Sequence, residues 1–135
     1  MSAGYSPRPL FKKLGIKENF KVRLINEPAY YFEILGDYPT NIEINNEPTQ
    51  LVNFIHFFVK TSEELNNHLP ILKDEIEKNG MIWVSWYKKS SKIPTDVTED
   101  TIRNLALSMG LVDVKVCAVD EKWSGLKLVW RKENR

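Results

Sequence analysis

The chain has 135 residues, of which 42% are apolar and 11% aromatic, so it can form one domain with a buried core. Its 19 basic and 18 acidic residues leave a net charge of +1, which gives no general field that attracts nucleic acid or an anionic membrane. The single cysteine, Cys117, excludes an internal disulfide and favours a reducing compartment.

Residues 1–20 are predicted to form an N-terminal arm that precedes a single α/β domain at 21–135. Leu10, Phe11 and Leu14 are spaced for one helical turn, and Gly15 is suited to end it. The first residues lack the apolar region of a signal peptide, and no apolar run approaches the roughly 18 residues of a membrane span. We therefore expect a cytoplasmic protein with no membrane partner.

The rest of the chain alternates between strand patterns and helix patterns. Apolar and β-branched runs predict six strands, at 21–26, 42–45, 51–59, 81–87, 111–119 and 126–130. Helices are expected after Pro28 up to Gly36, from Thr61 to 79–80, and from Thr98 to Gly110. The second helix has a capping-box pattern, with Thr61 followed by Glu64, and its apolar stripe is Leu65, Leu69, Leu72 and Ile76.

The pattern of these elements predicts a layered architecture. The strands at 51–59 and 81–87 are apolar on both faces, which is typical of parallel strands that are covered by helices on both sides. The alternation of strands and helices predicts a three-layer, Rossmann-like α/β fold with a mostly parallel six-stranded sheet. The short link at 120–125 indicates that the last two strands pair as an antiparallel hairpin.

Residues 51–86 and the final hairpin resemble parts of a known fold. The segment 51–86 is similar to the fourth-strand, helix and fifth-strand unit of S-adenosylmethionine-dependent methyltransferases, with a helix that ends in Asn79-Gly80 before an apolar strand. The final hairpin resembles the end of the methyltransferase sheet. This resemblance implies the strand order 2-1-3-4-6-5, with strand 6, the last one, antiparallel.

A second resemblance covers nearly the whole chain. It is carried by SAGYS at 2–6 with KKLGI at 12–16, WVSWYKK at 83–89 with PTD at 94–96, and GLVDVKVCAVDEKWSGLK at 110–127. In these stretches the chain resembles a small bacterial family known only as a domain of unknown function. The resemblance implies a truncated, degenerate methyltransferase-like fold. It implies no activity and no catalytic residues.

The turn after the first strand tests for a nucleotide-type cofactor. Rossmann-type sites need a Gly-rich turn there, so that backbone amides can approach the ligand closely. The turn at 26–30 reads Asn-Glu-Pro-Ala-Tyr, with no glycine, and Pro28 removes an amide donor. Glu47 follows at about the distance of a ribose-binding acid, but without the glycines it fits an ordinary loop side chain better. We therefore expect no resident cofactor.

Polar and aromatic residues gather where the predicted parallel strands end. In open parallel sheets, ligands bind beyond these carboxyl ends. The candidate ligand-binding residues at this edge are Glu27, Lys60, Trp86, Lys88, Lys89, Thr95, Asp96, Asp120, Trp123 and Ser124. Lysines, carboxylates and an indole suit a small anionic or planar ligand. The alternative is that these side chains collect in loops because loops face water.

Several other residues have two interpretations. The basic run at 88–92 holds either a phosphate or only water, and Trp123 either packs over the hairpin or lines the edge. His56 and Cys117 lie in apolar strands and are interpreted as buried core residues. No metal-ligand spacing and no Gly-x-Ser-x-Gly motif occurs, so the sequence predicts no metal site and no catalytic residue.

These observations favour a noncatalytic module that binds a small ligand or a partner protein. The first alternative is a divergent S-adenosylmethionine-dependent methyltransferase-like enzyme, and the second is a self-associating scaffold, so a homo-oligomer stays open. Nucleic acid is disfavoured as a partner because no stacking aromatic residues interleave the lysines of the run at 88–92.

Overall fold

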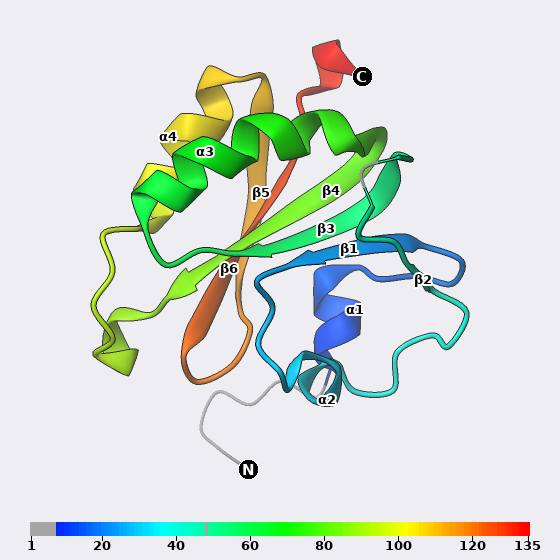
Figure 1. Cartoon of the computed structure of the whole chain (residues 1–135), viewed down its shortest axis with the longest axis horizontal. Coiled ribbons are helices and arrows are strands. Elements are labelled where there is room, and N and C mark those ends of the chain that lie inside the picture. The colour runs from blue at the N-terminus through cyan, green and yellow to red at the C-terminus, as the bar shows by residue number, and fades with distance from the viewer. Residues whose placement is uncertain (1–7, 48) are drawn as a thin grey trace.

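Six strands form one sheet in the computed structural model, which describes residues 8–47 and 49–135 (Figure 1). They are β1 (Lys21–Ile25), β2 (Glu43–Ile44), β3 (Val52–Phe58), β4 (Ile76–Tyr87), β5 (Leu111–Ala118) and β6 (Trp123–Trp130). The order β2-β1-β3-β4-β6-β5, with β6 antiparallel to both of its neighbours, confirms the sheet predicted from the sequence. The stretch 2–6 and the beginning of the predicted arm lie outside the described residues.

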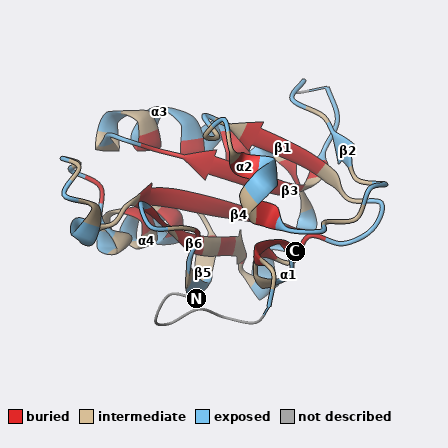
Figure 2. Ribbon diagram, turned by 90° about the horizontal axis from the view of Figure 1, so that it is seen from below, coloured by how far each residue is buried: buried red, intermediate tan, exposed pale blue. Residues whose placement is uncertain are grey.

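Helices cover both faces of this sheet. Figure 1 shows α3 (Ser62–Leu72) and α4 (Glu99–Ser108) on one side, and α1 (Leu10–Leu14) and α2 (Tyr31–Leu35) on the other. Each pair closes its own apolar core against the sheet, which gives the expected three-layer α/β fold. Figure 2 shows that burial is concentrated in the central strands, whereas β2 is exposed. Among the described residues, no helix is long and apolar enough to cross a membrane.

The short helix α1 is part of the core rather than a loose extension. Leu10, Phe11 and Leu14 are buried, and Gly15 ends the helix with a φ of 87°, a left-handed conformation that suits glycine. The indole Nε1 of the buried Trp83 donates a hydrogen bond to the carbonyl oxygen of Leu14 at 2.8 Å. This bond fixes α1 to the centre of the sheet. The predicted domain boundary at residue 20 stays a prediction.

The capping box that opens α3 is confirmed, but the predicted end of the helix is wrong. Thr61 accepts a hydrogen bond from the backbone N–H of Glu64, and the Glu64 side chain bonds back to Thr61. The helix ends at Leu72 rather than at 79–80, and a 3-10 turn, η1 (Lys73–Glu75), follows it. Ile76 continues the helical spacing by chance, because its side chain is buried from β4, where it pairs with Val52.

The start of β6 also differs from the prediction. The strand begins at Trp123 rather than at Leu126, so the link that was predicted at 120–125 is shorter. Asp120 Oδ1 accepts hydrogen bonds from the backbone N–H groups of Lys122 and Trp123, each at 2.8 Å, and so closes a tight turn. Trp123 and Ser124 therefore pair with the end of β4, next to Tyr87 and Trp86.

A buried chain of three polar side chains connects α2 to the central strands. The Tyr31 hydroxyl lies 2.8 Å from His56 Nδ1, and His56 Nε2 lies 2.7 Å from Ser85 Oγ. All three residues are buried, and the imidazole stacks on Phe58 with 4.3 Å between ring centroids. Burial lowers the pKa of His56 to about 3, since a charged ring would lose its hydration. His56 is thus a neutral core residue with both ring nitrogens engaged.

Replacing His56 should change how stability depends on pH. In the unfolded chain His56 binds a proton below a pKa of about 6.5, whereas the folded chain resists it down to a pKa of about 3. Its contribution is therefore present above pH 6.5 and is lost as the pH falls, by about 2 kcal/mol at pH 5. The free energies of unfolding of the wild type and of His56→Gln, measured by urea denaturation, should converge by about 2 kcal/mol between pH 7 and 5 and by about 3 kcal/mol by pH 4. Parallel curves for the two proteins would contradict it.

Candidate functional site

The turn between β1 and α2 is filled by its own side chains. Asn26 has a φ of 59°, so this residue takes the left-handed conformation that a glycine would otherwise adopt. Its side-chain Nδ2 donates to the carbonyl oxygen of Phe58 at 3.4 Å, across the ends of β1 and β3. The side chain of Tyr31 points into the core, where it bonds His56. The space beside this turn is thus occupied by protein atoms.

A long-range hydrogen bond closes the same turn against the hairpin. The Tyr30 hydroxyl donates to Asp120 Oδ2 at 2.8 Å. Burial, together with the bond to the Asp120 carboxylate, raises the pKa of Tyr30 to about 12, so this hydroxyl stays protonated near neutral pH. A small hollow of about 230 Å³ lies beside this bond, lined by Tyr30, Asp120, Glu121 and Lys122.

The residues of this turn do not fit the cofactor that a Rossmann-like sheet usually holds. A nucleotide-type ligand needs backbone amides that are close and free, and Pro28 has none to offer. The carbonyl oxygen of Pro28 accepts the N–H of Tyr31 at 3.0 Å, which uses a further amide of the turn. Glu47 is exposed, and its backbone oxygen accepts a hydrogen bond from the buried Arg23 at 2.7 Å. The turn therefore offers fewer backbone donors than the Gly-rich turn of a nucleotide site.

The larger opening at this edge lies beyond β4. It is a groove of about 840 Å³ between the end of β4, the loop at 88–97, the start of α4 and Ser124 of β6. Trp86 and Tyr87 line it from β4, and Lys88, Lys89 and Lys92 line it from the loop. We call this opening the lysine groove. Its volume falls within the range of about 300–1,000 Å³ that is typical of small-molecule sites.

Hydrogen bonds hold the loop that forms the groove wall. Thr95 Oγ1 donates to the carbonyl oxygen of Lys60 at 2.8 Å, which ties the loop to the end of β3. Ser91 Oγ donates to the carbonyl oxygen of Lys88 at 2.6 Å, in the 3-10 turn η2 (Lys89–Ser91). Lys92 turns the chain with a φ of 60°. The lysines of the groove therefore project from a defined backbone.

The charges around the groove are unevenly compensated. Arg103 pairs with Glu99, with Asp100 at 2.7 Å and with Asp113 at 2.9 Å, so its single positive charge offsets part of the charge of these three carboxylates. In contrast, the amines of Lys88, Lys89 and Lys92 make no ion pair in the part of the chain that the structure describes. The groove therefore has a local excess of positive charge, although the whole chain carries only +1.

The structure brings half of the predicted site residues together. The five that line the lysine groove are Trp86, Lys88, Lys89, Thr95 and Ser124. Asp120 lines the small hollow beside Tyr30, while Glu27 and Lys60 follow β1 and β3 at the same edge, outside the groove. Trp123 is only 4% exposed and stacks on Tyr87, with 4.1 Å between ring centroids. It supports the groove from within the core.

Asp96 has a structural role at the same edge. Its carboxylate accepts hydrogen bonds from the backbone N–H of Ser62 at 2.8 Å and from the Ser62 hydroxyl. These bonds lower the pKa of Asp96 below its usual value, the hydroxyl bond first and the backbone bond second. Asp96 thus holds the loop against the start of α3, where the positive end of the helix dipole lies.

Other groove residues were missed when the site was predicted from the sequence. They include Tyr87, Ser90, Lys92, Pro94, Thr98 and Glu99. The available signal was the whole loop after β4, because Lys92 and Ser90 belong to the basic run that suggested phosphate binding. Within the described residues, no three His, Cys, Asp or Glu side chains cluster as metal ligands.

Comparison with solved structures places this architecture among known folds. The chain is similar to a ribosomal protein L11 methylase from Lactobacillus delbrueckii subsp. bulgaricus, with a TM-score of 0.60 and 10% identity over 90% of this chain and 74% of that one. It is also similar to an S-adenosylmethionine-dependent methyltransferase from Aquifex aeolicus, with a TM-score of 0.61 and 17% identity over 87% and 85%. A tRNA methyltransferase from B. subtilis gives a TM-score of 0.55 and 7% identity over 93% and 67%.

Comparison by sequence gives no corresponding likeness. Neither the models of protein families nor the curated proteins include a match to this chain. At 7–17% identity, the likeness to solved structures shows a shared fold, and it shows no shared activity or ligand. The sheet of this chain, with its antiparallel strand β6, matches that of methyltransferase-like Rossmann folds.

Proposed function

We propose that this chain is a noncatalytic module that uses a methyltransferase-like fold to bind a small anionic ligand in the lysine groove. The observation that carries the proposal is the closed turn after β1. Asn26, Tyr30 and Tyr31 occupy the place where a Gly-rich turn would hold a cofactor. The remaining opening at the carboxyl edge is displaced toward β4.

The chemistry of the groove supports an anion as its ligand. Lysine amines act as point charges that bind phosphate or carboxylate oxygens, and nearby hydroxyls, such as that of Ser124, donate hydrogen bonds. Trp86 and Tyr87 add an apolar wall, which suits a ligand with a planar or aliphatic part. A ligand with one anionic end and a compact body therefore fits best.

A divergent S-adenosylmethionine-dependent methyltransferase-like enzyme is the second candidate. The likeness to methyltransferase structures over most of this chain favours it. In this case the cofactor would have to displace the hydrogen bond between Tyr30 and Asp120, or bind in the lysine groove instead of the usual place.

The finer identity of the chain belongs to the same proposal. The resemblance in the stretches at 12–16, 83–89 with 94–96, and 110–127 supports membership of a small bacterial family of unknown function. The lone Cys117 supports a reducing, cytoplasmic location. Burial raises the pKa of the Cys117 thiol, which supports an unreactive role for this cysteine.

Titration with S-adenosylmethionine separates the two candidate functions. We expect no saturable heat by isothermal titration calorimetry at millimolar S-adenosylmethionine, because the turn after β1 has no glycine and Pro28 supplies no amide donor. Saturable heat that disappears in Glu27→Gln or in Asp96→Asn would contradict the noncatalytic module and support the enzyme. The circular dichroism spectrum of each variant controls for its folding.

A second titration tests the lysine groove with inorganic pyrophosphate as the probe. We expect pyrophosphate to raise the melting temperature saturably, and the double variant Lys88→Gln/Lys89→Gln to weaken its affinity by at least about tenfold. The reason is that each charge-assisted hydrogen bond contributes about 1.5–3 kcal/mol. Added salt should weaken the binding further.

The matched control for this titration is Lys12→Gln. Lys12 is exposed on α1, so this variant removes one positive charge far from the groove. We expect wild-type affinity for pyrophosphate. A loss of binding free energy in Lys12→Gln that is half of the loss in the double groove variant, or more, would mean that pyrophosphate responds only to net charge, which would contradict a site in the groove.

A further inference from the structure

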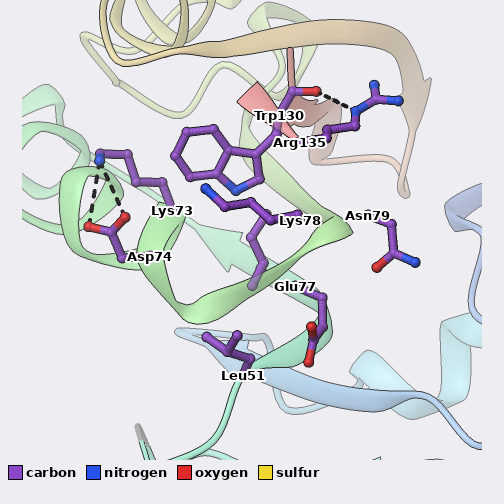
Figure 3. Close-up of a pocket in the computed structure, with 9 residues that line it drawn as sticks. Leu51, Lys73, Asp74, Glu77, Lys78, Asn79, Trp130 and Arg135 are labelled. Atoms are coloured by element: carbon purple, nitrogen blue, oxygen red, sulfur yellow. Dashed lines mark hydrogen bonds and ion pairs between the residues drawn. The ribbon is translucent and has the colours of Figure 1, made fainter. Parts of the chain in front are cut away.

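A second opening lies at the opposite edge of the sheet, where β4 begins and β6 ends. It has a volume of about 380 Å³ and includes Leu51 and Ile76 from the start of β3 and β4. Lys73, Glu77, Lys78 and Trp130 also line it (Figure 3). We call it the Trp130 pocket. It is separate from the lysine groove, and nothing in the proposed function uses it.

The indole of Trp130 carries an unsatisfied donor. Trp130 is only 6% exposed, and its Nε1 is buried without a hydrogen-bond partner, the only such side-chain atom among the described residues. Leaving a buried N–H without an acceptor destabilises the fold, so such a group calls for an explanation. In Figure 3 the nitrogen-bearing edge of the indole is turned toward Lys78, on the side of the pocket where Glu77 and Leu51 lie.

Two lysines are held over the face of this indole. Lys78 Nζ lies 3.9 Å and Lys73 Nζ 5.5 Å from the ring centroid. Lys73 is also paired with Asp74 at 3.4 Å, whereas Lys78 is exposed and makes no ion pair in the described part of the chain. Lys78 therefore brings one uncompensated positive charge next to a buried N–H donor.

The fold explains why Lys78 reaches this position. Val52 of β3 pairs with Ile76 of β4, but the next paired residues are Phe54 and Met81, so the residues between them in β4 bulge out of the sheet. Gly80 allows the bulge, because a Cβ there would lie 2.9 Å from the backbone oxygen of Asn53. The bulge carries Lys78 out over the indole of Trp130.

We propose that the Trp130 pocket binds a small monocarboxylate with an apolar body. One carboxylate oxygen would accept the Trp130 N–H, and the exposed Lys78 side chain would pair with the charge. The apolar body would pack on Leu51, which is 45% exposed here, and on Ile76. The cationic side chains at the pocket are Lys73, Lys78 and Arg135, and the carboxylates of Asp74 and Glu77 offset most of their charge, which favours a ligand with one negative charge over a phosphate dianion.

The indole N–H itself reports on this site. In a proton–nitrogen correlation spectrum of the full chain, the four tryptophans give four indole signals, and Trp130→Phe identifies the one that belongs to Trp130. With sodium benzoate as the probe, we expect the Trp130 indole proton to move downfield and to saturate. Benzyl alcohol, which has the same ring without the charge, should move it far less.

Two variants and one control separate binding from packing. Trp130→Phe keeps the ring face for the lysines but removes the donor, and Lys78→Gln changes only an exposed side chain. We expect each to weaken benzoate binding about tenfold, followed through the backbone signals of Ile76 and Asn79, because each loses one charge-assisted hydrogen bond. Lys12→Gln, on the far face of the sheet, should leave the affinity unchanged.

Several results would overturn the proposal. They are an indole signal that stays still or moves without saturation, equal shifts with benzyl alcohol, and stronger binding of inorganic phosphate than of benzoate. Unchanged affinity in Lys78→Gln would also count against it, since this variant leaves the core intact. None of these readouts depends on the lysine groove, so the proposal for each site is tested separately.

Discussion

The hydrogen-bonded chain from Tyr31 through His56 to Ser85 is the constraint on which the carboxyl edge of the sheet depends. It crosses from α2 to β3 and β4, and it leaves both ring nitrogens of a neutral, buried histidine satisfied. With Tyr31 fixed in the core, Tyr30 comes to lie within reach of Asp120, and the turn after β1 closes against the hairpin. The bond between Tyr30 and Asp120 therefore closes this edge beside β1, whereas the lysine groove opens beyond β4.

Charge is arranged differently at the two ends of β4. At its carboxyl end, the three lysines of the groove outnumber the two carboxylates that line it, Glu99 and Asp100, so a local excess of positive charge remains. At its amino end, Lys73 is paired with Asp74 and a single exposed lysine lies over Trp130. A chain that is almost neutral overall thus presents two cationic openings, one suited to a multiply charged anion and one to a singly charged anion.

The sequence predicted what depends on local chemistry and missed what depends on distant contacts. Thr61 with Glu64 and the glycine after α1 mark helix ends by themselves, and the apolar runs predicted the strand order through the resemblance they carry. The end of α3 was predicted wrongly because helical spacing cannot distinguish the apolar stripe of a helix from a strand residue such as Ile76, which pairs with Val52. Only part of the groove was predicted, since most of its other residues lie in the loop after β4, whose folded path is set by tertiary contacts, and the rest come from the start of α4.

A cofactor could bind at the usual site of a methyltransferase-like fold here only if the turn after β1 rearranged. To open it, Tyr30 must leave Asp120 and Asn26 must leave the backbone of Phe58, each at a cost of about 1 kcal/mol. Moving Tyr31 as well would strip a buried imidazole nitrogen of its partner, at a further cost of about 1–3 kcal/mol. A ligand would lose these contributions before it gained any affinity, whereas the lysine groove is already open. This cost supports the proposed site at the end of β4, where the loop after the strand and the start of α4 already form the lysine groove.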